Sequence, residues 1–353
     1  MDNICLESVW QTRLQQLGWS DRAATQTVLH WASSTIQLYN RQVVKFRNFC
    51  DKSCVCFPPK PEQSSLFADF MCSVADSSVR PESVLRSTSA ALSGFYHGLG
   101  QHSPMDNSDI QKLISALTKT GTKLPARRTP IMPCAPFMTL FQGWPDNEAL
   151  SIKDLRLKTV TLMALNFMTR PSDLAPKGVL FNPETFETLH IDLSVKQLLF
   201  NDDSVIVLFF GIKNDSARTG FEVRIAAAQD NKIDMVAALK CYVSRTAHVR
   251  STILGEPLFI SLRPPYRAIR VGTISQILSD AISLAGLGGL GFTPKSFRPS
   301  AATAAVQANV KPETAMQIGR WKTEKVFRDR YVYPLTDKDY SDKMLQFKGL
   351  NTV

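Results

Sequence analysis

A basic, proline-rich segment divides this sequence into two unequal parts. Residues 121–136 contain one glycine and four prolines: Gly121, Pro125, Pro130, Pro133 and Pro136. Proline has no amide N–H and clashes with the preceding helical turn, so this segment is predicted to be an extended linker. The sequence has 353 residues, a length that suits two domains. We therefore expect one domain at residues 1–120 and another at residues 137–353, the second ending in a C-terminal tail.

The first of these parts shows the apolar periodicity of helices and no strand pattern. Apolar side chains recur every three or four residues in four segments, which begin near Ser33, Ser64, Pro81 and Asp109. Serine and aspartate often cap a helix, and proline is tolerated in its first turn. Residues 1–120 are therefore predicted to form an all-α, four-helix bundle.

The second part mixes helical and strand patterns. A buried helix is predicted at residues 155–168, and further helices are predicted at about residues 231–247, 271–286, 296–308, 312–320 and from 323 onward. Three short strands are predicted at residues 189–198, 204–210 and 220–225. The fold class predicted for the whole chain is mainly α, and its second domain is α+β with one small antiparallel sheet.

Composition limits which cellular compartments and which partners are expected. No apolar run approaches the roughly 18–20 residues that span a bilayer, and residues 1–20 lack a secretory signal. The seven cysteines suit reduced thiols better than a disulfide framework. We therefore expect no membrane partner and an intracellular protein that is not secreted, nuclear in a eukaryote and otherwise cytoplasmic.

The positive charge is concentrated in two short stretches. Lysine and arginine exceed aspartate and glutamate by 10, and residues 121–130 carry a net +3 while residues 261–330 carry +7. The residues before and between these stretches are nearly neutral. This distribution indicates a polyanionic partner, although a solvated basic surface would look the same.

Three other patterns carry little weight. Gly286, Gly288 and Gly291 spell GxGxxG, but they follow a helical pattern instead of joining a strand to a helix, so a loop is favoured over a dinucleotide site. Cys50, Cys54 and Cys56 lack a second ligand pair at metal-binding spacing. The five histidines are scattered as well, so we expect no metal site.

Four residues in the second part could form a phosphate site. Arg170 follows the predicted buried helix, where it could also be a capping cation. Arg298 opens a helix of small residues, and free N–H groups at a helix start favour an anion. Two guanidiniums can bind a phosphate through paired hydrogen bonds. Trp321 adds an indole donor, and Tyr331 follows it by ten residues.

Taken in order, these motifs resemble the tyrosine recombinase (phage integrase) family. The resemblance rests on Arg170 in TRPSDL, Lys213 in GIKNDSARTG, Lys295 and Arg298 in KSFR, Trp321 in GRW, and Tyr331. It covers nearly the whole chain, since the bundle, linker and mixed domain look like that family's core-binding and catalytic domains. The segment WKTEKVFRDRYVYP is most similar to recombinases of the eukaryotic DIRS, Ngaro and Crypton elements.

The sequence departs from the family pattern at two positions. Lys295 stands where a histidine is usual, three residues before the second arginine. The nucleophile usually lies nine residues after the histidine or tryptophan position, and that residue here is Arg330. Tyr331 is the nearest tyrosine, and Tyr333 remains an alternative nucleophile.

The resemblance implies cleavage and rejoining of DNA through a 3′-phosphotyrosyl intermediate. Tyr331 would attack phosphorus, and Arg170, Arg298 and Trp321 would stabilise the phosphoryl oxygens. Lys213 would protonate the 5′-oxygen, and Lys295 would support Lys213 or the phosphate. Neither a metal nor ATP nor any other cofactor would be needed. The implied role is integration or excision of a mobile element.

Partners follow from the same resemblance. Double-stranded DNA would be bound by dimers on each site and by a tetramer at synapsis, with strand exchange through a Holliday junction. The basic residues expected to contact DNA are Arg41, Lys45, Lys123, Arg127, Arg128, Arg320 and Lys322. Two alternatives stay open: a non-catalytic DNA-binding protein derived from a recombinase, and a type IB topoisomerase.

Overall fold

The chain forms two compact units, Met1–Arg127 and Arg128–Val353. The structure is a computed structural model. It describes residues 5–28, 33–79, 81–120, 130–175, 179–181, 188–190, 193–210, 215, 219–253 and 255–332. Residues 121–129, most of the expected linker, lie outside this range. The helix α7 (Ala135–Gln142) begins inside the stretch expected to be extended, with Pro136 in its first turn, a position that needs no amide hydrogen bond.

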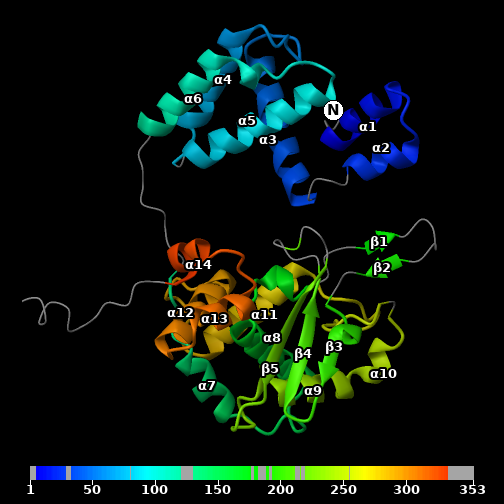
Figure 1. Ribbon diagram of the computed structural model, residues 1–353, viewed down its shortest axis with the longest axis vertical. Coiled ribbons are helices and arrows are strands. Elements are labelled where there is room, and N and C mark those ends of the chain that lie inside the picture. Colours follow the sequence, from blue (N-terminus) through cyan, green and yellow to red (C-terminus); the bar gives the residue numbers. More distant parts are fainter. Residues whose placement is uncertain are drawn as a thin grey trace, which may run out of the picture. The chain divides into compact units, whose positions relative to one another are not determined.

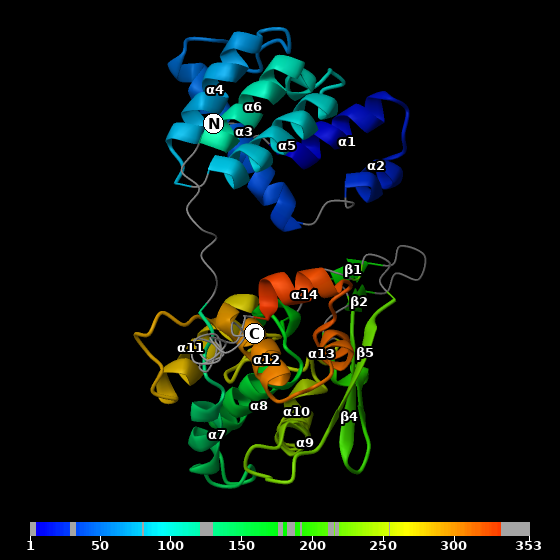
Figure 2. The ribbon, with the colours of Figure 1, turned by 60° about the vertical axis from the view of Figure 1, so that its left-hand side comes forward.

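The described part of the first unit is all-helical (Figure 2). Its elements are α1 (Leu6–Gln16), α2 (Asp21–Val28), α3 (Ser33–Lys52), α4 (Ser64–Asp76), α5 (Pro81–Gly98), η1 (Pro104–Asp106) and α6 (Ser108–Thr120). Four of these helices match the expected ones, and α1 and α2 were not predicted. Their sequences are rich in glutamine and threonine, and each buries only two side chains, which leaves little periodicity to detect.

Aromatic packing holds this first unit together. The ring of Phe46 on α3 lies 5.1 Å from that of Phe67 and 4.8 Å from that of Phe70, both on α4. Tyr96 on α5 is buried, and its hydroxyl donates to the carbonyl of Pro59 at 2.8 Å. These contacts join α3, α4 and α5 around one core, as the apolar spacing of the sequence requires.

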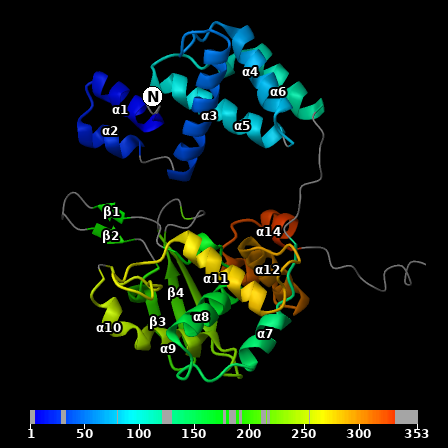
Figure 3. The same cartoon turned by 180° about the vertical axis from the view of Figure 1, so that it is seen from behind.

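The second unit surrounds one buried helix, α8 (Ile152–Asn166) (Figures 1 and 3). Every residue from Leu155 to Leu165 is buried, and α8 packs against α9, α11 and α12. Even Lys158 is fully buried, where its ammonium donates to Asn147 at 2.8 Å. The other helices are α9 (Met235–Arg245), α10 (Ala247–Arg250), α11 (Val271–Leu284), α12 (Phe297–Gln307), α13 (Pro312–Gly319) and α14 (Glu324–Tyr331). Short 3₁₀ turns are η2 (Pro171–Asp173), η3 (Val195–Gln197) and η4 (Pro294–Ser296).

A three-stranded antiparallel sheet lies in the order β3-β4-β5. Its strands are β3 (Leu198–Phe200), β4 (Ser204–Phe209) and β5 (Phe221–Ala226), with Val207 opposite both Leu198 and Val223. Val205, Val207 and Phe209 alternate along β4 and are buried, so the core-facing side of this strand is apolar. The mainly α fold class and its small antiparallel sheet are thereby confirmed.

The strand expected at residues 189–198 is wrong in its extent. Among the described residues, the strand β2 (Thr188–His190) pairs with β1 (Val179–Phe181), and β3 starts at Leu198. Between them the Ser194 hydroxyl accepts from the amide of Lys196. The Gln197 side chain in turn accepts from the amide of Ser194. This capping box starts a 3₁₀ turn in place of a strand. Among the described helices, none is long and apolar enough to cross a membrane.

Candidate active site

The C-terminal turn of α8 sets the position of Arg170. The amide of Thr169 donates to the carbonyl of Ala164 at 3.2 Å, and that of Met168 donates to Leu165 at 3.3 Å. These two bonds form a Schellman motif, in which Met168 takes the left-handed backbone conformation at φ 48°. Pro171 then begins η2, so the helix cannot continue past Arg170.

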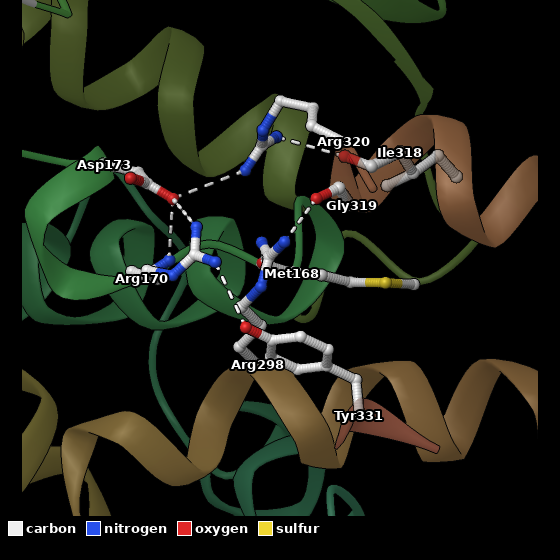
Figure 4. A network of polar contacts seen from close by, with 8 residues as sticks. All are labelled: Met168, Arg170, Asp173, Arg298, Ile318, Gly319, Arg320 and Tyr331. Atoms are coloured by element: carbon white, nitrogen blue, oxygen red, sulfur yellow. Dashed lines mark hydrogen bonds and ion pairs between the residues drawn. The ribbon is translucent and has the colours of Figure 1, made fainter. Parts of the chain in front are cut away.

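The guanidinium of Arg170 connects an aspartate to a tyrosine (Figure 4). Its Nη1 lies 3.9 Å from the buried carboxylate of Asp173, which also accepts a 3.0 Å hydrogen bond from the Arg170 amide. Its Nη2 donates to the hydroxyl of Tyr331 at 3.1 Å. The Arg170 side chain is 29% exposed, so the guanidinium is oriented by protein groups while still open to a ligand.

Arg298 lies in the first turn of α12 and is almost fully buried. Its Nη1 donates to the carbonyl of Met168, and its Nη2 donates to that of Gly319 at 2.6 Å. Both carbonyls belong to helix C-terminal turns, whose partial negative charge stabilises a cation. Burial and repulsion from Arg170 and Arg320 lower the pKa of Arg298 to about 9. Arg298 therefore stays mainly charged at neutral pH and joins α8, α12 and α13.

The end of α13 repeats the geometry at the end of α8. Arg320 is left-handed at φ 60°, and the amide of Trp321 donates to Met316 at 2.9 Å. Gly319 is required here because a Cβ on it would lie 1.8 Å from the Trp321 ring. Trp321 is buried, and its indole N–H has no hydrogen-bond partner among the described residues.

Tyr331 is the last residue of α14, and its ring packs on the other site residues. Its ring centroid lies 4.9 Å from that of Trp321, and the guanidinium of Arg298 lies 4.1 Å from the Trp321 ring and 5.1 Å from the Tyr331 ring. Burial raises the pKa of Tyr331. The positive charges of Arg170 and Arg298 and the hydrogen bond from Arg170 lower it more, so the pKa lies below its ordinary value.

These side chains open into one pocket of about 600 Å³. Its lining includes Arg170, Lys295, Arg298, Arg330 and Tyr331. Lys295 and Arg330 are exposed, whereas Arg298 is buried at the base. Four cations and one tyrosine thus line the same pocket, an arrangement that favours a phosphate group or another anion.

The structure brings together most of the residues expected to be catalytic. Arg170, Arg298 and Tyr331 are in contact, Trp321 packs against them, and Lys295 lies on the same pocket. Lys213 and the alternative nucleophile Tyr333 lie outside the described residues. The paired phosphate binding expected of Arg298 is modified, because backbone carbonyls already occupy both of its terminal nitrogens.

The residues expected to contact DNA are placed unevenly. Arg41 and Lys45 on α3 are exposed, as is Lys322 after α13. Lys123, Arg127 and Arg128 lie outside the described residues. Arg320 requires a correction because it is only 2% exposed. Its guanidinium lies 3.7 Å from Asp173 and 4.2 Å from the Phe209 ring, so in this structure it faces the protein interior.

Two groups of residues were missed by the sequence analysis. Asp173, three residues after Arg170, is the aspartate of the TRPSDL motif but was given no role. The second group is an exposed arginine loop, residues 261–270, which contains Arg263, Arg267 and Arg270. The +7 charge of residues 261–330 was the signal that could have revealed it.

This arginine loop is anchored at its base and leads to the pocket. Its backbone closes where the amide of Ser261 donates to the carbonyl of Arg267 at 2.8 Å. The buried Arg156 donates to the carbonyl of Ile260 at 2.8 Å. Beyond the loop, Val271 and Ser275 of α11 line the pocket. The loop therefore leads directly into the helix whose first residues line the pocket.

Metal ligands are not gathered in the part of the chain that the structure describes. No group of three or more histidine, cysteine, aspartate or glutamate side chains is close enough there to hold a metal ion. The positive charges that line the pocket belong to arginine and lysine.

Comparison with known proteins defines the fold. No family model and no curated protein sequence matches the chain. Among solved structures, the XerH site-specific recombinase bound to difH substrate, a pre-cleavage complex, is similar with a TM-score of 0.54 and 11% identity over 89% of this chain and 79% of that chain. Its post-cleavage complex with palindromic difH substrate gives 0.56 and 12% identity over 88% and 80%.

An integrase from a transposon is also similar in structure to this chain. The Tn1549 transposon integrase in complex with transposon right end DNA has a TM-score of 0.50 and 15% identity over 98% of this chain and 99% of that chain. The fold of this protein is therefore that of the tyrosine recombinases. Its structural neighbours are site-specific recombinases and integrases.

Proposed function

We propose that this chain cleaves and rejoins DNA strands as a tyrosine recombinase, with Tyr331 as nucleophile. The observation that carries the proposal is the 3.1 Å hydrogen bond from Arg170 to the Tyr331 hydroxyl, inside a pocket lined by Lys295, Arg298 and Arg330. A nucleophile, a positioned cation and an anion-binding cavity are the parts that phosphoryl transfer requires.

The chemistry begins at the Tyr331 oxygen. Arg170 and Arg298 lower the pKa of Tyr331, so the phenolate is more accessible than in a free tyrosine. The oxygen attacks phosphorus, the bond to the 5′-oxygen breaks, and a 3′-phosphotyrosyl link forms. Because that link replaces one ester by another, the reaction needs neither ATP nor another energy source.

Cations around the pocket stabilise the charge that develops on the phosphoryl oxygens. Arg170 is partly exposed and lies beside the attacking oxygen, so it can donate directly to the phosphate. Arg298 contributes its charge from the pocket base. Lys295 is a proton donor for the departing 5′-oxygen or a phosphate ligand, and Lys213 is the second candidate for that proton. This chemistry uses protein cations in place of a metal.

Within one chain, Arg170 and Tyr331 are already adjacent, which supports cleavage by a protomer's own tyrosine. We extend the proposal to duplex DNA bound by dimers and to a tetramer that exchanges strands through a Holliday junction. The similarity of WKTEKVFRDRYVYP to DIRS, Ngaro and Crypton recombinases supports integration or excision of a mobile element, in the nucleus of a eukaryotic host.

The test is a suicide substrate, a nicked duplex whose short 5′-hydroxyl fragment diffuses away after cleavage. A cleavable site is first selected from a pool of random-sequence duplexes. The covalent protein–DNA adduct is then measured on a denaturing gel. We expect an adduct with the parent protein and none with Tyr331→Phe, with unchanged DNA affinity. Tyr333→Phe is the matched control. An adduct that persists in Tyr331→Phe and disappears in Tyr333→Phe would assign the nucleophile to Tyr333.

A supercoil-relaxation assay, run beside the adduct assay, separates the alternatives. Relaxation of supercoiled DNA by isolated protomers without synapsis would favour a type IB topoisomerase. Binding of DNA without any adduct would favour a DNA-binding protein that has lost catalysis.

A further inference from the structure

The fold of the candidate site contains one buried cation that the proposed chemistry does not use. Arg320 follows α13 directly, and its guanidinium is enclosed by protein groups. Its Nη1 donates to the carbonyl of Ile318 at 3.1 Å, and its plane lies over the Phe209 ring of β4 at 4.2 Å. A side chain enclosed in this way cannot contact DNA without leaving its site.

Arg320 contacts the candidate catalytic groups through one carboxylate. Its Nη2 lies 3.7 Å from Oδ2 of Asp173. The same oxygen accepts the hydrogen bond from the Arg170 amide at 3.0 Å and lies 3.9 Å from Nη1 of Arg170. Figure 4 shows Asp173 between the two guanidiniums, with Tyr331 on the far side of Arg170.

The electrostatics of this cluster give Arg320 a specific task. Asp173 is buried, and a buried carboxylate needs paired charges and hydrogen bonds to compensate for lost hydration. Arg170 alone supplies only part of that compensation because its guanidinium is partly exposed and turned toward Tyr331. Arg320 adds a second positive charge from inside the core, where solvent screening is weak.

We propose that Arg320 is a positioning residue: it holds Asp173, and Asp173 holds the Arg170 guanidinium against Tyr331. The inference rests on the proposed function for its effect on catalysis. The positioning of Arg170 by Asp173 and Arg320 can also be tested without catalysis, because the orientation of Arg170 affects the ionisation of Tyr331. The charges that lower the pKa of Tyr331 are those of Arg170 and Arg298, so we expect Arg320 to act on this tyrosine mainly through the position of Arg170.

The first experiment measures single-turnover adduct formation at saturating DNA. Arg320→Met keeps an unbranched side chain close in length to the aliphatic part of arginine, and it removes the charged guanidinium. We expect the rate to fall on the order of 10²-fold, as misplacing a reacting group does, while the Kd for DNA changes less than about twofold. The matched control is Arg328→Met, an exposed arginine on α14 paired with Glu324, which should match the parent.

A double-mutant comparison then tests whether Arg320 acts through Arg170. In an Arg170→Ala background, Arg320→Met should lower the rate no further, because the group that it positions is already absent. A further large loss in that background would overturn the inference. So would a weaker Kd with an unchanged rate at saturation, since that result would make Arg320 a DNA contact.

A readout that needs no catalysis separates this inference from the proposed function. The Tyr331 hydroxyl is titrated by NMR of ¹³C-labelled tyrosine, assigned with Tyr331→Phe. We expect Arg320→Met and Asp173→Asn to raise the pKa of Tyr331, and Arg320→Lys to raise it less because it keeps the charge. If Arg320→Met or Asp173→Asn unfolds, the pKa of Tyr331 in the Arg320→Lys protein decides whether the inference holds. An unchanged pKa in all folded variants would overturn the inference even if the parent protein cleaves DNA.

Discussion

The guanidinium of Arg170 donates a 3.1 Å hydrogen bond to the hydroxyl of Tyr331, although 161 positions separate the two residues in the sequence. The end of α8 and the end of α14 supply the two partners. The contact brings a cation to an oxygen that can act as a nucleophile. It also predicts how substitution of each residue of the site should affect ionisation, stability and cleavage.

The ionisation of Tyr331 should depend on Arg170. Removing this positive charge and its hydrogen bond disfavours the phenolate, so Arg170→Gln should raise the pKa of Tyr331 toward its ordinary value. The cleavage rate, which increases with phenolate content, should then need a higher pH. Rates from pH 6 to 10 and the ¹³C titration of Tyr331 measure this shift, with Arg328→Gln as control. A downward shift would contradict the assignment.

Arg170 and Arg298 should differ in their effects on stability. Arg298 satisfies the carbonyls of Met168 and Gly319, so Arg298→Ala should lower the free energy of unfolding by about 2–3 kcal/mol. Arg170→Ala should lower it less because that side chain is partly exposed. Both should slow cleavage by roughly 10² or more. Denaturant unfolding and single-turnover assays measure the two effects, and full activity without either arginine would refute their catalytic role.

Lys295 should act as a donor and not as a base. An ammonium donates to a phosphate oxygen at all pH values below its own pKa, whereas a neutral histidine can also accept a proton. Lys295→His should keep substantial cleavage activity, and Lys295→Ala should lose about 2–4 kcal/mol of transition-state stabilisation. Single-turnover rates across pH 6–9 decide between these outcomes. A Lys295→Ala protein as fast as the parent would make this lysine a solvated charge.

The arginine loop should contribute to DNA affinity and to its salt dependence. Each phosphate contact contributes about 0.9 to the slope of log K against log salt concentration. Replacing Arg263, Arg267 and Arg270 by glutamine should therefore reduce the magnitude of this slope by about 2 to 3. Fluorescence anisotropy at several salt concentrations measures it. Arg86→Gln, which removes an exposed arginine paired with Glu82 in the first unit, is the control, and an unchanged slope would remove the loop from the interface.

Chelators should leave the chemical step intact. Arg170, Lys295 and Arg298 line the pocket and supply the positive charge that metal ions provide in two-metal nucleases. Single-turnover cleavage in EDTA should equal that in Mg²⁺ at matched ionic strength. Loss of cleavage in EDTA that Mg²⁺ restores would support a nuclease mechanism instead.

Local patterns in the sequence predicted most of the helices and the order of the candidate site residues. The spacing of apolar side chains predicted α3 to α6 and α8, because a helix forms from contacts between residues three and four positions apart. It failed at α1 and α2, where few apolar side chains mark a buried face. It also extended a strand across Ser194, where side-chain hydrogen bonds favour a 3₁₀ turn.

Arg170, Arg298, Trp321 and Tyr331 could be singled out from the sequence because each stands in a recognisable motif. Only the tertiary structure decided which groups each of these side chains contacts. In the structure, Arg298 donates hydrogen bonds to the carbonyls of Met168 and Gly319. Arg320, which was expected to contact DNA, pairs with Asp173 in the core. Charge and motif are local properties of a sequence. Burial and ion pairing depend on which helix ends meet, and these ends meet only when distant segments pack around α8.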